Sequence, residues 1–173
     1  LAASAAAEHI NRTNISQGIA ATVWPARLEI ISQFPFVLLD GAHNLQACRA
    51  LVASLARLSE NAPFVFLTGM MRDKDYKEML NLVLNAKEYN CAGVVFTDVP
   101  NDRTATAETL LDAAESVLDP EVKAMLPMSA ISDYNEALVQ ALRLAESTGA
   151  LLCVFGSLYL AGAIRKRMRE LQE

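Results

Sequence analysis

The sequence predicts an α/β domain, with a mainly parallel sheet and helices on both faces of that sheet. Short apolar runs alternate with amphipathic stretches along the chain, which is typical of βαβ units. The apolar runs are continuous rather than alternating, as expected for strands that are buried on both faces. With 173 residues, of which 53% are hydrophobic and 20% charged, the chain is also large and apolar enough to bury such a core.

The expected elements begin with two helical stretches. Residues 1–10 are rich in alanine, and residues 16–23 end before the Trp24-Pro25 pair, because the residue before a proline avoids the α conformation. Strands are expected at 27–32, 36–39, 63–68, 92–97, 123–128 (a weak one) and 150–155. Helices are expected at 45–59, 76–88, 107–118, 133–147 and 158–171. In the helix at 45–59, apolar residues recur at helical spacing and form one stripe.

Composition argues against two classes of protein. The net charge is −5 and the pI about 5.1, whereas a nucleic-acid-binding protein needs a basic face. The basic cluster at 165–170 falls at the end of an expected helix, where cations suit the helix dipole. Residues 147–164 carry no charge and approach the length of a membrane span, but Gly149, Gly156 and Gly162 interrupt them. We therefore expect a strand, a turn and a helix there, and no membrane segment.

The three cysteines, Cys48, Cys91 and Cys153, lie far apart and form no CxxC pair. An odd number of scattered cysteines in apolar surroundings indicates reduced, buried thiols. This pattern predicts a cytoplasmic protein.

Candidate ligand-binding residues follow the expected strands. In an open parallel sheet the ligand lies beyond the carboxyl ends of the strands, so polar residues there are expected to line one edge of the domain. They are Asp40, His43, Asn44, Arg72, Asp73, Lys74, Asp75, Asp98, Asn101, Asp102, Arg103 and Ser157.

The turn at residues 40–44, in the stretch LLDGAHN, holds three of them. Asp40 has the acceptor chemistry that binds a ribose diol, or it caps the turn by accepting from nearby N–H groups. His43 can donate to a phosphate or flank a base, or it is a structural histidine. Asn44 is best placed as the N-cap of the following helix, with a nucleotide contact as the alternative.

Three further residues have two interpretations each. Lys74, between two aspartates, either forms a surface ion pair or binds a substrate carboxylate. Ser157 starts a helix directly after a strand, where it caps the helix or helps to bind an anion. Arg27 can pair with Glu29 or clamp a phosphate. The sequence has no GxxxxGK[ST], GxGxxG or HExxH pattern, so a complete ATP site requires another domain.

Four motifs occur in order along the chain: WPARLE at 24–29, LLDGAHN at 38–44, TGMMRDKD at 68–75 and FGSLYLAG at 155–162. Together they resemble the C-terminal domain of folylpolyglutamate synthases and bifunctional dihydrofolate synthases, within the wider Mur ligase family. The resemblance implies a Rossmann-like fold and identifies residues 24–173 as a C-terminal glutamate ligase domain. It identifies residues 1–23 as the helical tail and linker of a central ATPase domain outside this sequence.

The resemblance also implies an activity. ATP phosphorylates a carboxylate of folate or dihydropteroate, and L-glutamate then attacks the acyl phosphate to form an amide. ATP and Mg²⁺ would be bound mostly by the N-terminal ATPase domain of the same polypeptide, so that the isolated domain would be inactive. Nucleic acid and membranes are not expected as partners.

By the same resemblance, Arg27 reaches the nucleotide phosphates and Asp40 the ribose. His43 lies near the nucleotide or the reacting phosphoryl group. Lys74 pairs with the carboxylate of the incoming glutamate, and Ser157 assists it.

Two motif positions depart from the family pattern. Ala26 stands where the family has glycine, and alanine suits that position only if its φ angle is negative. Leu45 stands where the family has proline, which removes no functional group. The family asparagine that contacts adenine would fall at or before Leu1, so this contact is left unassigned.

Two other functions stay open at this point. A Mur-type cell-wall amino-acid ligase shares the architecture, but such enzymes tend to show DYAHxP where this chain has DGAHN. A Rossmann-like binding module without catalysis would agree with the absence of a phosphate loop.

Overall fold

A single sheet forms the centre of the domain. The computed structural model describes residues 24–59 and 62–172, and the helices expected at 1–10 and 16–23 lie outside them. Within the described residues, six strands form one sheet in the order β1-β2-β6-β3-β4-β5. They are β1 (Glu29–Gln33), β2 (Phe36–Leu39), β3 (Phe64–Thr68), β4 (Cys91–Phe96), β5 (Met128–Ala130) and β6 (Leu151–Phe155). Strands β2 to β6 run parallel, whereas the edge strand β1 pairs antiparallel with β2, so the predicted mainly parallel sheet is confirmed.

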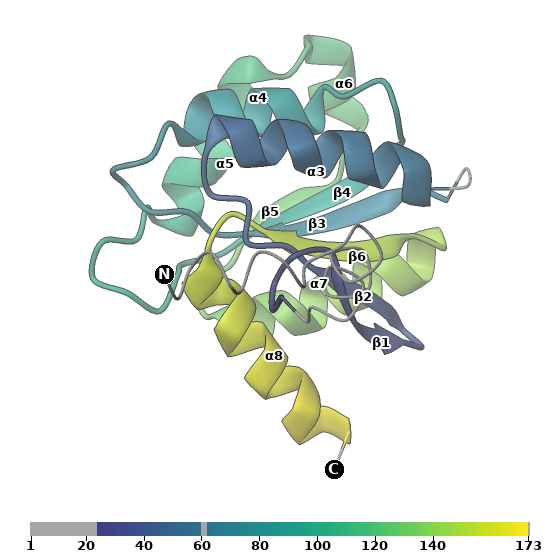
Figure 1. Ribbon diagram of the computed structural model, residues 1–173. Coiled ribbons are helices and arrows are strands. Elements are labelled where there is room, and N and C mark those ends of the chain that lie inside the picture. The colour runs from purple at the N-terminus through teal and green to yellow at the C-terminus, as the bar shows by residue number, and fades with distance from the viewer. Residues whose placement is uncertain (1–23, 60–61, 173) are drawn as a thin grey trace, which may run out of the picture.

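Helices cover both faces of the sheet (Figure 1). They are α3 (Leu45–Leu58), α4 (Tyr76–Leu84), α5 (Ala107–Val117), α6 (Pro120–Met125), α7 (Tyr134–Thr148) and α8 (Leu158–Gln172). Helices α3, α4 and α5 pack on the face that carries Phe66 and Phe155, and α7 and α8 pack on the face that carries Leu67 and Val154. Successive residues of a strand point to opposite faces of the sheet. Because helices cover both faces, the residues on both faces must be apolar.

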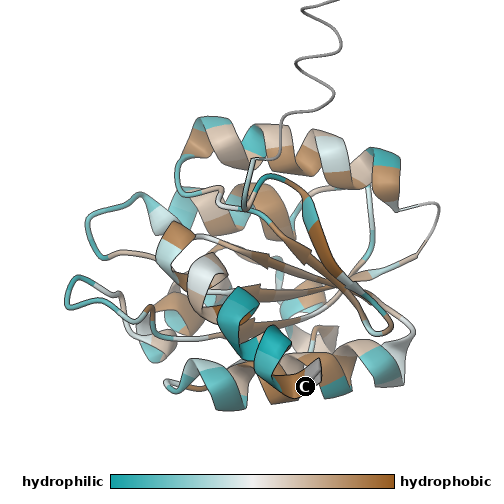
Figure 2. Cartoon of the chain, turned by 60° about the horizontal axis from the view of Figure 1, so that its bottom comes forward, coloured by the Kyte–Doolittle hydropathy of each residue, from teal (hydrophilic) through white to brown (hydrophobic). Residues whose placement is uncertain are grey.

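The hydropathy of the chain follows these layers. Figure 2 shows the strands of the sheet in brown and the C-terminal half of α8, which holds the basic cluster, in teal. The uncharged stretch at 147–164 forms the end of α7, strand β6 and the start of α8, as expected. Among the helices in the described part of the chain, none has both the length and the apolar character needed to cross a membrane.

The weak strand expected near residues 123–128 is present but lies further along the chain. Residues 123–125 belong to helix α6, and β5 begins only at Met128. Pro120 sits at the start of α6, where its fixed φ favours the first helical turn and its lack of an N–H is harmless.

Helix α4 ends at Leu84 and is shorter than the expected helix at 76–88. The side-chain amide of Asn85 donates to the carbonyl of Val117 at 3.1 Å. The hydroxyl of Tyr89 donates to the carbonyl of Val83 at 2.7 Å, and its ring packs edge-on against Phe64. Residues 85–89 therefore close the end of α4 instead of extending it.

The cysteines are free thiols, as expected. Cys48 and Cys153 are buried and Cys91 is half-buried. Burial raises the pKa of Cys48 to about 12 and the pKa of Cys91 to about 11, so both thiols are protonated at neutral pH.

Candidate functional site

The predicted site residues gather at one edge of the domain. The carboxyl ends of the parallel strands β2, β6 and β3 meet there, and the connections that follow them carry residues 40–44, Ser157 and Lys74. The antiparallel β1 starts at the same edge, since Glu29 pairs with Leu39 at the end of β2. Its orientation therefore brings Arg27, just before β1, beside the turn at residues 40–44.

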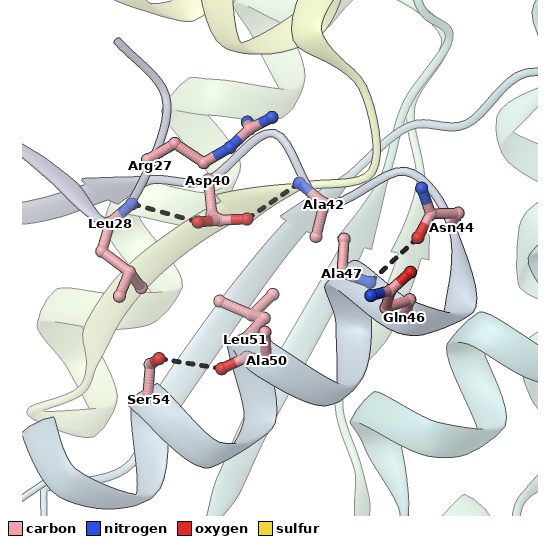
Figure 3. Close-up of a pocket in the computed structure, with 10 residues that line it drawn as sticks. All are labelled: Arg27, Leu28, Asp40, Ala42, Asn44, Gln46, Ala47, Ala50, Leu51 and Ser54. Carbon is pink, nitrogen blue, oxygen red and sulfur yellow. Dashed lines mark hydrogen bonds between the residues drawn. The ribbon is translucent and has the colours of Figure 1, made fainter. Parts of the chain in front are cut away.

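Asp40 is at the centre of this edge and is only 7% exposed. Its Oδ2 accepts from the N–H of Leu28 at 3.0 Å, and its Oδ1 accepts from the N–H of Ala42 at 2.8 Å (Figure 3). The turn-capping role is thus present. A carboxylate offers about four lone-pair sites, so these two bonds leave acceptor capacity for a ligand.

A pocket of about 420 Å³ lies against Asp40 and is called the Asp40 pocket here. Its walls come from the turn before β1, from residues 40–44 and from the first turns of α3, and they include Arg27, Leu28, Asp40, Asn44 and Gln46 (Figure 3). The expected N-cap role of Asn44 is confirmed, because its Oδ1 accepts from the N–H of Ala47 at 2.9 Å. Its amide also lines the pocket, so the cap does not exclude a ligand contact.

The turn that carries Arg27 is strained. Ala26 and Leu28 have φ angles of 52° and 47°, a conformation that costs a residue other than glycine about 1–2 kcal/mol. The negative φ required for an unstrained Ala26 is therefore not found. The carbonyl of Ala26 accepts from the N–H of Gly41 at 2.8 Å and from Arg27 Nη1 at 2.9 Å, which holds the turn against residues 40–44.

Gly41 makes room for Arg27. A Cβ atom at residue 41 would lie 2.6 Å from Arg27 Nη1 and would overlap the side chain of Leu158. Both contacts are to the ends of flexible side chains, so an added methyl group would move these side chains rather than the backbone. The glycine therefore sets the position of the guanidinium.

From the sequence-based expectation that Arg27 reaches nucleotide phosphates, we predict that Gly41→Ala raises the Kd for ADP roughly 10- to 150-fold in the complete polypeptide, because loss of a hydrogen bond to a charged group costs about 1.5–3 kcal/mol. The midpoint of thermal unfolding should change little. Gly162→Ala is the matched control, since nothing lies within 4 Å of a Cβ there. Calorimetric titration with ADP measures the effect, and equal Kd values for both variants would contradict this role of Gly41.

A second pocket, of about 180 Å³, lies on the other side of residues 40–44. It is called the Lys74 pocket here and is lined by His43, Met71, Lys74, Arg103, Ser157 and Tyr159, among others. The ring of His43 is fixed by a bond of 2.8 Å between its Nδ1 and the carbonyl of Gly41. Since a carbonyl only accepts, Nδ1 carries the proton, and Nε2 is the free nitrogen of the neutral ring.

Two cations of the Lys74 pocket converge on one carboxylate oxygen. Lys74 Nζ lies 3.5 Å and Arg103 Nη1 3.9 Å from Oδ2 of Asp73. Partial desolvation raises the pKa of Asp73, but its own backbone N–H and the two cations outweigh this and hold the pKa below its usual value. The spacing of the two cations therefore suits a carboxylate.

The sequence places Arg103 at this edge but assigns it no role. Two loops meet through backbone bonds: Arg72 N–H donates to the carbonyl of Arg103 at 2.8 Å, and Ala105 N–H to that of Met70 at 2.9 Å. No sequence motif marks this pairing. The structure thus adds Arg103 to the candidate residues.

Ser157 is buried at the start of α8, and its Oγ accepts from the N–H of Tyr159 at 3.2 Å. The preceding Gly156 has a φ of 106°, and a Cβ there would lie 2.6 Å from the carbonyl oxygen of Gly69. The connections that follow β6 and β3 are therefore in backbone contact, which fixes Ser157 relative to the loop of Lys74.

The predicted residues thus form one cluster with two parts. Arg27, Asp40 and Asn44 line the Asp40 pocket, and His43, Lys74 and Ser157 line the Lys74 pocket. The described residues contain no group of three or more His, Cys, Asp or Glu side chains that could hold a metal ion. The two pockets thus present a carboxylate acceptor in one and two cationic side chains in the other.

Comparison with known proteins agrees with this architecture. The folylpolyglutamate synthase of Lacticaseibacillus casei is 32% identical over 155 residues, which cover 90% of this chain and 32% of that protein. The structure of Mycobacterium tuberculosis folylpolyglutamate synthase complexed with ADP superposes with a TM-score of 0.77 at 25% identity, over 91% of this chain and 35% of that one. The bifunctional folylpolyglutamate synthase/dihydrofolate synthase of Yersinia pestis, complexed with AMPPNP and a Mn ion, gives 0.70 at 25% identity, over 95% of this chain and 35% of that one.

The chain spans about a third of the length of these relatives. The profile of the family described as Mur ligase, glutamate ligase domain, matches residues 26–158, which run from the strained turn to the start of α8 and include every candidate residue. The sheet order, the two pockets and this match lead to one conclusion: the chain belongs to the glutamate ligase domain family of the Mur ligases.

Proposed function

We propose that this domain is the glutamate-adding part of an ATP-dependent folylpolyglutamate or dihydrofolate synthase. The observation that carries the proposal is the position of the two pockets on opposite sides of residues 40–44. A diol and phosphate site on one side and a carboxylate site on the other would hold the two reactants next to each other. The names of the relatives support folate or dihydropteroate as the acceptor.

In this proposal the Asp40 pocket binds ATP. The free lone pairs of Asp40 accept from the ribose hydroxyls, and the exposed guanidinium of Arg27 contacts the phosphates. Asn44 donates its amide to the same nucleotide. Asp40 would thus stabilise the turn and bind the ligand at once.

The Lys74 pocket binds L-glutamate. Lys74 and Arg103 pair with its carboxylate groups, and Ser157 contributes its hydroxyl. Nε2 of His43 is unprotonated in the tautomer that the bond to Gly41 requires, so it can accept a proton from the glutamate ammonium group. His43 would therefore act where the amine becomes a nucleophile.

The reaction joins these two sites. The γ-phosphoryl group of ATP passes to the carboxylate of the folate or dihydropteroate, which gives ADP and an acyl phosphate. His43 takes one proton from the glutamate ammonium group, the resulting amine attacks the acyl carbon, phosphate leaves with the C–O bond electrons, and the second proton of the nitrogen passes to the departing phosphate. Mg²⁺ neutralises phosphate charge in such transfers, and from the family resemblance we propose that an ATPase domain of the same polypeptide binds most of it.

We further propose that residues 24–173 form the ligase domain and that residues 1–23 link it to that ATPase domain. The free thiols support a cytoplasmic location. In this arrangement the isolated domain would be inactive, because half of the ATP site lies elsewhere.

The test is an assay of the complete natural polypeptide with ATP, labelled glutamate and either folates, dihydropteroate or nucleotide-linked muropeptides. We expect ADP release and label incorporation with a pterin acceptor only. Incorporation into muropeptides would favour the Mur-type alternative, and binding of ADP without any amide product would favour a non-catalytic module.

A further inference from the structure

We propose that Arg165 of helix α8 is a positioning residue for the nucleotide: it acts through Glu29 to hold the strained turn that carries Arg27. Neither residue lines the Asp40 pocket, and neither belongs to the residues assigned above. The expected effect of Arg165 on the KM for ATP rests on the proposed function, whereas its expected effect on the turn at residues 26–28 does not.

A short chain of contacts connects Arg165 to the turn. Nη2 of Arg165 forms an ion pair with Oε2 of Glu29, and the two side chains are only 22% and 30% exposed. The same oxygen accepts from the N–H of Ala26 at 2.7 Å. Two contacts therefore separate α8 from the first strained residue of the turn.

The turn needs this support because its conformation is unfavourable. Both Ala26 and Leu28 adopt positive φ, and each residue gives its N–H to a carboxylate, Ala26 to Glu29 and Leu28 to Asp40. These two bonds orient the peptide groups that precede Ala26 and Leu28, at the two ends of the segment that carries Arg27. If Glu29 changes rotamer, the first bond is lost and the backbone at 26–28 relaxes towards negative φ, which moves Arg27.

Electrostatics hold Glu29 in the required state. Burial raises the pKa of Glu29, but the Ala26 N–H and the Arg165 guanidinium lower it more, so its pKa lies below the usual value. A partly buried ion pair of this kind adds little net stability. Nε of Arg165 is also buried without a hydrogen-bond partner among the described residues, which makes a purely stabilising role less favourable. We therefore infer that the ion pair acts by holding the Glu29 carboxylate in place, and not by stabilising the domain.

The other end of α8 is held separately. Ser157 and Tyr159 line the Lys74 pocket, and the contact between Gly156 and Gly69 fixes that end independently of Arg165. Removing the Arg165 side chain should thus affect the nucleotide and spare glutamate.

The experiment compares Arg165→Ala, Arg165→Lys and Arg167→Ala in the complete natural polypeptide. Arg167 is the matched control, because it is on the same helix and pairs with Glu170 of that helix. For Arg165→Ala we expect the Kd for ADP and the KM for ATP to rise about tenfold, the KM for glutamate to stay within twofold, and amide exchange at Ala26 and Leu28 to accelerate. Arg165→Lys should recover part of the ADP affinity, and Arg167→Ala should match the wild type.

An unchanged Kd for ADP with unchanged amide exchange in Arg165→Ala would overturn the inference, as would an equal rise in the KM for glutamate. Melting temperatures of the variants separate local from global effects. If the wild type adds no glutamate to any acceptor, the proposed function fails, while ADP binding and amide exchange still decide the role of Arg165.

Discussion

Replacing Asp40 with asparagine is expected to lower the catalytic rate of the full-length enzyme roughly 5- to 150-fold and to destabilise the domain by about 1–3 kcal/mol. Both carboxylate oxygens of Asp40 accept from backbone N–H groups. An asparagine has one acceptor oxygen, so its NH₂ group must face either the N–H of Leu28 or that of Ala42. One buried donor then loses its partner, and the turn that presents Arg27 and His43 shifts.

The two roles of Asp40 can be separated with a modified nucleotide. We expect the wild type to bind ADP more tightly than 2′,3′-dideoxy-ADP, and Asp40→Asn to bind both equally weakly, because the single acceptor oxygen of the variant is uncharged and is engaged by a backbone N–H. Asp75→Asn is the control, since Asp75 is an exposed carboxylate at the same edge whose side chain makes no capping bond. A variant at residue 40 that still preferred ADP would exclude the ribose contact.

Lys74→Ala is expected to raise the KM for glutamate roughly 10- to 150-fold and to leave the KM for ATP unchanged. A hydrogen bond to a charged group contributes about 1.5–3 kcal/mol, and each 1.4 kcal/mol corresponds to a factor of ten. Lys74 is half-buried, and among the described residues its ion-pair partner is the exposed Asp73, so its loss should not unfold the domain.

Steady-state kinetics with glutamate and ATP varied in turn will measure the KM for each substrate separately. Lys77→Ala is the control, because Lys77 follows three residues later, is exposed and does not line the Lys74 pocket. Arg103→Ala should resemble Lys74→Ala if both cations bind the glutamate carboxylates. Equal KM values for glutamate in Lys74→Ala and Lys77→Ala would show that Lys74 does not bind glutamate.

Most of the fold could be predicted from local sequence patterns. Strands β2, β3, β4 and β6 are buried on both faces, and such runs stand out between amphipathic helices. Strand β5 could not be placed, because it has three half-buried residues and follows a helix whose start depends on Pro120. The end of α4 was missed for a different reason, since Tyr89 turns towards Phe64, a contact between distant residues.

The site was only partly predictable. The motifs placed Asp40, His43 and Lys74 at one edge, since the carboxyl ends of parallel strands meet there. They did not reveal that Asp40 bonds to the strained turn through the N–H of Leu28, because this contact joins residues twelve positions apart and the positive φ angles of the turn are not marked in the sequence. Arg103 was equally hidden, because backbone pairing of two loops brings it to Lys74.

The contact between Gly156 and Gly69 has a consequence for changing which amino acid the domain accepts. The main chains approach closely at these two glycines. The neighbouring strand ends are also bonded to each other, because the hydroxyl of Thr68 donates to the carbonyl of Phe155 at 3.1 Å, which opposes separation of the loops of Lys74 and Ser157. The Lys74 pocket could therefore accept a bulkier amino acid only if the side chains that line it were made smaller, and not by separation of the loops. Met71 and Tyr159 line that pocket without such anchoring, and they are where a redesign of acceptor size should begin.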